Sequence, residues 1–228
     1  LNPPSCTVTF SQRKATLSAL TRGTFKMCQS AVLAPFDRPT RVSFLEAARV
    51  YHRVYLRTPQ LPTVAAETIV TDRSPIQVTH YLRGKWELSL LELSIVVGLA
   101  RTRQAGRIFE IGTFDGRTTL NLHLNAPEAE IHTIDLPAGK SGAPDGKTPG
   151  ALIREHVAGG RIHQLWGDSL AFDFSPWHGT RDFVFVDAGH SYRNARADSR
   201  TALRLIEGRE GAILWHDYGS WPGVTQAV

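Results

Sequence analysis

The sequence of 228 residues is long enough for one α/β domain with an extension, and short for two independent enzymatic domains. Its 26 basic and 21 acidic residues give a formal net charge of +5, and because the basic residues are scattered, nucleic acid is not favoured as a partner. No apolar run approaches the roughly 20 residues that span a bilayer, and no signal-peptide pattern opens the chain. Cys6 and Cys28 lack metal-site spacing, so a cytoplasmic protein is expected.

The first part of the chain, residues 1–85, is predicted to be a partly helical extension or cap before a main domain over residues 86–228. Thr7–Phe10 is a candidate short strand. Helical spacing of apolar residues and a capping box predict a helix from Ser43 to Tyr55. The N-terminal helices are expected to cover the strand ends of the main domain or to form a homodimer contact.

The main domain alternates strand and helix patterns, as a parallel sheet requires. A helix is predicted over Leu88–Leu99, before the first strand. The predicted strands are Ile108–Gly112, Glu130–Leu136, Arg161–Trp166, Asp182–Asp187 and Gly211–His216, with helices over Arg117–Leu124 and Ser191–Ile206. Residues 137–150 are predicted to be a loop, either an active-site lid or a surface insertion. The expected fold is α/β, a Rossmann-like three-layer sandwich with a mostly parallel sheet.

The turn after the first strand is the most informative segment, and it reads E-I-G-T-F-D-G from Glu110 to Gly116. Glycines in such a turn let the backbone approach a ligand, and the helix start offers free N–H groups. This geometry suits a nucleotide-like cofactor. The spacing is Gly-x-x-x-Gly, however, so the turn does not match the Gly-x-Gly-x-x-Gly fingerprint of dinucleotide-binding proteins.

This turn resembles motif I of the class I S-adenosylmethionine (SAM) methyltransferases. The similarity is greatest to the small-molecule branch of catechol, caffeoyl-CoA and macrocin-type O-methyltransferases and methyltransferase family 24. Further matches follow in order at later strand ends: Asp135, Gly167-Asp168-Ser169, Asp187 to Tyr192, and Trp215 to Tyr218. The resemblance covers residues 87–228. It implies a sheet that ends in an antiparallel pair of strands, and those C-terminal strands are expected to be missing because the sequence stops at Val228.

The resemblance assigns cofactor contacts to the ends of the first three strands. Asp135 would accept hydrogen bonds from the ribose hydroxyls, and Asp168 would meet the adenine amino group. The predicted cofactor-binding residues are Glu110, Gly112, Thr113, Asp115, Gly116, Asp135, Gly167, Asp168 and Ser169. The alternatives are an N-cap role for Asp135 and ordinary turn chemistry for Asp168 and Ser169.

The last two strand ends carry carboxylates and histidines. In the families that the chain resembles, carboxylates at these positions bind a divalent cation, so the predicted metal ligands are Asp187, Asp217 and His216. Oxygen ligands suit Mg²⁺, and a histidine also admits Mn²⁺ or Zn²⁺. Relatives often carry a second Asp where Gly189 stands. With a degraded metal site, His190 or His216 would act as a general base.

The predicted catalytic residues are therefore His190, His216 and Asp187. Around the last strand, Trp215, Tyr218 and Trp221 either wall a pocket or pack under the loop. On the preceding helix, Asp198 is expected to face solvent.

Together these residues predict a SAM-dependent methyltransferase that acts on a small molecule at a hydroxyl oxygen, with a divalent metal as an optional aid. Two alternatives stay open. One is an NAD(P)-dependent oxidoreductase, against which the missing Gly-x-Gly-x-x-Gly counts; the other is an inactive SAM-fold protein that serves as a scaffold. Acceptor pockets in such folds are built by variable loops, so the sequence does not name the acceptor.

Overall fold

The computed structural model describes residues 61–81, 87–140, 148–156 and 160–228, together with short pieces between residues 28 and 45. The chain divides into two compact units, Leu1–Arg57 and Thr58–Val228, and the second unit contains the sheet. The predicted strand Thr7–Phe10 lies outside the described residues, as does the predicted helix Ser43–Tyr55 except for Leu45. The expected domain boundary at residue 85 falls within the second unit.

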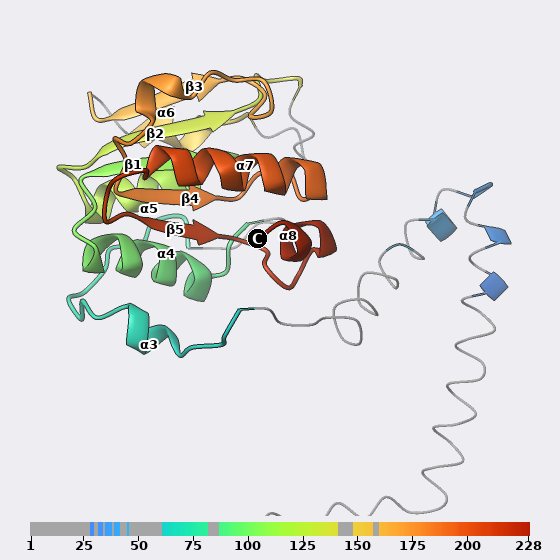
Figure 1. Cartoon of the computed structure of the whole chain (residues 1–228), viewed down its shortest axis with the longest axis horizontal. Helices are drawn as coiled ribbons and strands as arrows, with labels where there is room; N and C mark the ends of the chain where they lie inside the picture. Colours follow the sequence, from blue (N-terminus) through green and yellow to red (C-terminus); the bar gives the residue numbers. More distant parts are fainter. Residues whose placement is uncertain are drawn as a thin grey trace, which may run out of the picture. The chain divides into compact units, whose positions relative to one another are not determined.

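Five strands form one fully parallel sheet in the order β3-β2-β1-β4-β5 (Figure 1). They are β1 Arg107–Ile111, β2 Glu130–Asp135, β3 Ile162–Trp166, β4 Phe183–Val186 and β5 Ala212–Trp215. All five predicted strands are confirmed, each end within one residue of its expected place. The chain moves outward from β1 to β3 and then returns to β4 on the other side of β1. Ligands of open parallel sheets bind at such a switch point, beyond the carboxyl ends of the strands.

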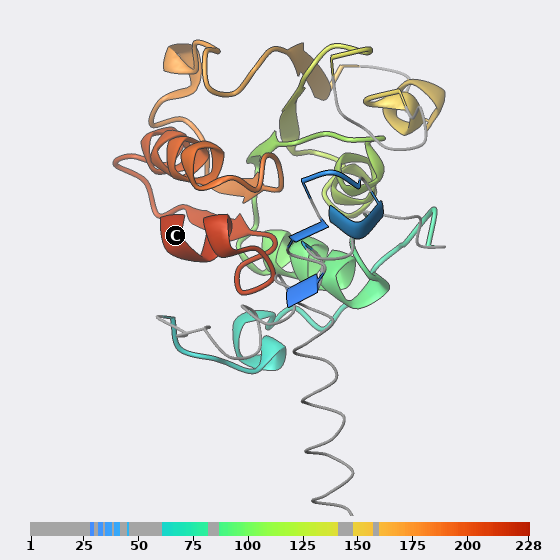
Figure 2. The same ribbon diagram turned by 90° about the vertical axis from the view of Figure 1, so that its right-hand side faces the viewer.

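Helices cover both faces of the sheet and complete three layers. Figure 2 shows α7 Tyr192–Leu205 and α8 Pro222–Ala227 on one side of the strands, and α4 Leu90–Thr102 and α5 Arg117–Asn125 on the other. The helices not foreseen from the sequence are α3 Ala66–Ile69, α6 Ala151–His156 and η3 Ser175–Trp177. None of the described helices is both long and apolar enough to cross a membrane.

Alternation along the strands builds a core on each face. Ile108 and Phe185 pack with the buried side of α4, whereas Phe109 and Val184 join the cluster beneath α7. Neighbouring strand residues therefore point to opposite faces, and both faces are apolar, as expected of a parallel sheet covered by helices on both sides. This packing fixes the strand ends that carry the site.

Asp198 corrects one expectation, because it is 1% exposed instead of solvent-facing. It shares the inward face of α7 with Ala195, Ala202 and Leu205, at helical spacings of three, four and seven residues. Burial raises the pKa of Asp198 to about 6, although the polar side chain of Ser169 lowers it. The charged residues around it suggested a solvated helix face, and only the packing of α7 shows otherwise.

Candidate active site

The turn after β1 depends on two glycines in the left-handed region. Gly112 has φ +106°, and a Cβ there would lie 2.0 Å from the backbone oxygen of Asp187. Gly116 has φ +93° at the start of α5, and a Cβ there would lie 2.6 Å from Cγ1 of Ile153. L-residues with a Cβ rarely adopt such φ values, so both positions require glycine. The contact at Gly112 also places the turn directly beside the end of β4.

Glu110 comes just before this turn, and its side chain is 0% exposed. Its Oε2 accepts hydrogen bonds from the Thr119 hydroxyl and, at 2.7 Å, from the Thr133 hydroxyl. Its Oε1 has no hydrogen-bond partner among the residues that the structure describes. Burial raises the pKa of Glu110 to about 8, although the two threonine hydrogen bonds lower it. Its predicted cofactor role is therefore best interpreted as support of the turn.

The neutral state of Glu110 gives a first testable prediction. Folding raises the pKa of Glu110 from 4.5 to about 8, so between these values the folded protein holds a proton that the unfolded chain releases. The unfolding free energy should fall as the pH rises through this window, by up to about 1.4 kcal/mol per pH unit. Glu110→Gln should flatten that slope, as urea unfolding at several pH values would measure. An unchanged slope would contradict a buried, titrating Glu110.

Asp135 joins the end of β2 to the same turn. Its Oδ2 accepts a hydrogen bond from the Phe114 N–H at 2.6 Å, and its Oδ1 accepts one from the Leu136 N–H at 2.7 Å. Burial raises the pKa of Asp135, although these backbone N–H groups lower it. Each carboxylate oxygen has a second lone pair for a ligand hydroxyl. Asp135 therefore combines a structural role with the predicted ribose contact.

The other predicted cofactor residues differ in exposure. Thr113 and Asp115 are buried within the turn, whereas Asp168 is exposed after β3. Oδ1 of Asp168 accepts a hydrogen bond from the Leu170 N–H at 3.0 Å, which is ordinary turn chemistry. Gly167 and Ser169 flank Asp168 and are partly exposed. The turn leaves Asp168 Oδ2 for the predicted adenine contact.

Two carboxylates and two histidines converge beyond the ends of β4 and β5. Nε2 of His190 lies 2.8 Å from Oδ2 of Asp217. Nδ1 of His216 lies 3.2 Å from Oδ1 of Asp187 and 3.3 Å from Oδ2 of Asp217. The structure thus brings together all the residues that the sequence predicts as catalytic or metal-binding. We call these four residues the acid–histidine cluster.

The members of the acid–histidine cluster differ in protonation state because of their mutual charges. Burial alone would lower the pKa of His216, but the carboxylates of Asp187 and Asp217, 3.2 and 3.3 Å from its Nδ1, raise it to about 10. Burial would raise the pKa of Asp217, but His190 and His216 hold it well below its usual range. His216 is therefore an imidazolium cation at neutral pH in this arrangement. A cation cannot accept a proton, which favours His190 over His216 as the general base.

The three aromatic residues predicted around the last strand lie in different environments. Trp221 stacks on His190 with ring centroids 4.6 Å apart, so it walls the cluster. Trp215 instead packs in the core beneath α7, and its Nε1 donates a hydrogen bond to Oγ of Ser199 at 3.0 Å. The Tyr218 hydroxyl accepts a hydrogen bond from the backbone of Leu61 at 3.3 Å.

One neighbour of the acid–histidine cluster was not foreseen from the sequence. Oε1 of Glu92 lies 3.6 Å from Nε2 of His216, while its Oε2 accepts the Ser89 N–H in the capping box of α4. The capping-box spacing could have drawn attention to Glu92. Only the fold, however, brings the start of α4 to the end of β5.

A metal ion could be held within this cluster. Asp187, His190 and Asp217 each offer a ligand atom, and these atoms lie within 4.8 Å of one another. Two carboxylates and an imidazole suit Mg²⁺ or Mn²⁺. The sequence predicted His216 as the third ligand, whereas this grouping of described residues contains His190 instead.

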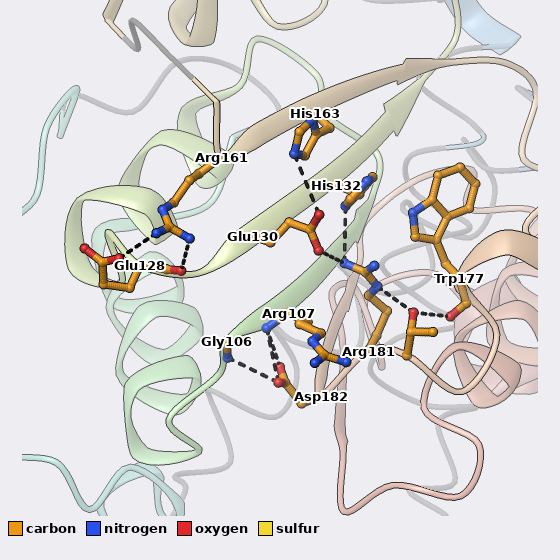
Figure 3. A network of polar contacts seen from close by, with 11 residues as sticks. Gly106, Arg107, Glu128, Glu130, His132, Arg161, His163, Trp177, Arg181 and Asp182 are labelled. Atoms are coloured by element: carbon orange, nitrogen blue, oxygen red, sulfur yellow. Dashed lines mark hydrogen bonds and ion pairs between the residues drawn. The ribbon is translucent and has the colours of Figure 1, made fainter.

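A second group with metal-binding chemistry lies near the amino-terminal ends of β2 and β3, and contains Glu130, His132 and His163 (Figure 3). Arg181 already supplies a cation there, since its Nη1 lies 3.2 Å from Oε2 of Glu130 and 3.2 Å from Nδ1 of His132. Burial and the Arg181 charge lower the pKa of His132 to about 4, so the ring is neutral and can accept the guanidinium N–H. This group is therefore best interpreted as a structural network that ties β2 to the segment before β4.

The sheet order, the glycine turn beside β4 and the acidic residue at the end of β2 are those that the resemblance to class I SAM-dependent methyltransferases predicts. Consistent with this, residues 109–218 match the family model described as a methyltransferase domain, family 24. This part of the chain is a methyltransferase domain of that family. The oxidoreductase alternative is thereby set aside. No curated protein matches the sequence.

Several solved structures resemble this fold. The SAH-bound methyltransferase PaMTH1 from Podospora anserina shares 23% identity, with 81% of this chain and 72% of that chain covered and a TM-score of 0.48. Cofactor-bound Rv0187 from MTB shares 23% identity, with 81% and 82% covered and a TM-score of 0.49. The O-methyltransferase TomG from Streptomyces achromogenes, in complex with SAM, shares 21% identity, with 62% and 68% covered and a TM-score of 0.42. Likeness at this level does not identify the acceptor of this chain.

Proposed function

We propose that this methyltransferase transfers the methyl group of SAM to a hydroxyl oxygen of a small-molecule acceptor. The observation that carries the proposal is the acid–histidine cluster directly beside the cofactor turn, where Gly112 packs against Asp187. Transfer to oxygen requires the loss of a hydroxyl proton, and His190 paired with Asp217 at 2.8 Å can remove it.

The cofactor would be held by residues from three strand ends. Gly112 and Gly116 set the shape of the turn beside the cofactor. Asp135 would accept the ribose hydroxyls, and Asp168 would accept the adenine amino group. SAM, when bound, supplies an electrophilic methyl group on a sulfonium. The protein then has mainly to align the acceptor with that methyl group and to take its proton.

The hydrogen-bond partner of His190 determines which of its ring nitrogens takes the proton. Nε2–H donates to Oδ2 of Asp217, and this leaves Nδ1 to accept the proton of the acceptor hydroxyl. Asp217 then stabilises the resulting imidazolium. His216, already cationic between Asp187 and Asp217, would stabilise negative charge that develops on the acceptor oxygen.

A divalent cation is the alternative source of positive charge at the same place. Asp187 and Asp217 would hold it with His190 or His216, and the cation would orient the acceptor hydroxyl and lower its pKa. A metal on His190 would remove this residue as the base. The two arrangements therefore predict opposite responses to a chelator: little change for the metal-free cluster, and loss of activity for the metal site.

An acceptor screen tests the proposal. The protein is incubated with methyl-labelled SAM and matched sets of hydroxyl, amine and thiol compounds, with and without EDTA. We expect label on the oxygen of at least one hydroxyl class, with an equivalent amount of S-adenosylhomocysteine formed. Transfer confined to amines or thiols would contradict O-methylation.

A further inference from the structure

Arg117 is a buried cation beside the cofactor turn that the site described above does not use. It is the first residue of α5, directly after Gly116, and is 4% exposed. Its Nε donates to the backbone oxygen of His80 at 2.6 Å, and its Nη1 donates to that of Leu88 at 2.8 Å. Its Nη2 is buried and has no partner within the part of the chain that the structure describes.

The simplest interpretation of Arg117 is a tether that holds Leu88 and the segment of residues 77–81. That segment has other attachments to α5, however. Asn121 bonds the backbone of Thr79, and Asn125 bonds the backbone of Gln77 through two hydrogen bonds at 2.8 and 2.7 Å. These amides hold the segment without charge. A guanidinium adds a charge whose burial is costly unless an anion pairs with it.

The protein itself compensates this charge weakly. Its ion-pair partner is the carboxylate of Glu87, whose Oε2 lies 3.9 Å from Nη1 of Arg117. That distance is too long for a direct hydrogen bond, and it concerns Nη1 and not the unpaired Nη2. Arg117 therefore retains a guanidinium nitrogen suited to an anionic ligand.

The sheet order indicates which part of the cofactor reaches this place. The proposed ribose and adenine contacts, Asp135 and Asp168, lie at the carboxyl end of β2 and just after β3, on one side of β1. The methyl group must face the cluster after β4 and β5 on the other side. The amino-acid end of SAM, which branches from the same sulfur as the methyl, then lies near the connection from β1 to α5, where Arg117 begins the helix.

We infer that Nη2 of Arg117 binds the α-carboxylate of SAM, an assignment that rests on the proposed function. The hydrogen bond would be charge-assisted, and the positive end of α5 would add to it. Arg117 would thus be a specificity-determining residue for the amino-acid end of the cofactor. The same side chain would keep its hydrogen bonds to the backbone oxygens of His80 and Leu88.

The test compares two ligands that differ only in this carboxylate: S-adenosylhomocysteine and its decarboxylated analogue, S-adenosyl-3-thiopropylamine. Calorimetry measures the ratio of their dissociation constants for the wild type, Arg117→Met, Arg117→Lys and Asn125→Ala. Asn125→Ala is the matched control, because it removes two hydrogen bonds to the same segment without removing a charge.

We expect the wild type and Asn125→Ala to prefer S-adenosylhomocysteine by about tenfold or more, the size of one charge-assisted hydrogen bond. Arg117→Met should bring the ratio close to one, and Arg117→Lys should retain part of the preference and remain testable if the Met variant does not fold. Equal weakening of both ligands, or an unchanged ratio, would show a tether only and overturn the assignment. Wild type that binds neither ligand would overturn the proposed function together with it.

Discussion

Asp217→Asn is expected to lower kcat about a thousandfold on the acceptor found by the screen, within the range for loss of general-base catalysis. Asp217 lies 2.8 Å from Nε2 of His190 and 3.3 Å from Nδ1 of His216, and both histidines hold its pKa far below the usual range. The amide removes this negative charge, so His190 loses the partner that orients it and stabilises its protonated form. Steady-state kinetics at saturating SAM measures the change.

Asparagine can replace Asp217 without added backbone strain, because Asp217 has φ +62° and asparagine tolerates the left-handed region. The fold and the affinity for S-adenosylhomocysteine should therefore persist. The control is Asp173→Asn, the same chemical change at an exposed turn where Oδ1 accepts the Ser175 N–H. If Asp217→Asn kept near wild-type kcat, Asp217 would have no part in proton removal or metal binding.

Gly112→Ala is expected to destabilise the protein by more than about 4 kcal/mol and to abolish SAM binding. The new Cβ would lie 2.0 Å from the backbone oxygen of Asp187, and φ +106° is a conformation that alanine rarely adopts. Relief requires that the ends of β1 and β4 separate, and this moves the turn away from the acid–histidine cluster. Urea unfolding and calorimetry with S-adenosylhomocysteine measure the two effects.

Gly208→Ala is the control that separates backbone strain from the steric clash of the new Cβ. Gly208 has φ +72°, with nothing within 4 Å of an added Cβ. It carries the backbone strain without the clash and should cost about 1 kcal/mol. A loss at Gly112 no greater than that at Gly208 would mean that the contact with Asp187 does not hold the turn.

The strands could be predicted because the signal for each is local. An apolar run such as that of β4, followed at once by a polar strand end, identifies a parallel strand covered on both faces. The same pattern located Asp135, Asp187 and His216, since carboxyl ends of parallel strands meet at one edge of the sheet. The glycines followed from the turn that they permit.

The contacts that could not be predicted depend on packing between distant segments. Glu92 meets His216 because the fold brings the start of α4 to the end of β5. Arg117 meets His80 and Leu88 because residues before α4 pack against the start of α5. Asp198 looked solvent-exposed because charged residues surround it in sequence, although it lies on the buried face of α7. A short helix such as α6, with six residues, has too few turns for a clear period.

Titration of the protein with S-adenosylhomocysteine, compared with NAD and with the Asp135→Asn variant, tests the central claim most directly. We expect one site per chain for S-adenosylhomocysteine and no heat of binding for NAD. The Asp135 carboxylate faces both the turn and the proposed ribose, so its amide should weaken binding about tenfold or more. Failure of wild type to bind S-adenosylhomocysteine, or binding that Asp135→Asn leaves unchanged, would contradict a SAM site built on the turn from Glu110 to Gly116.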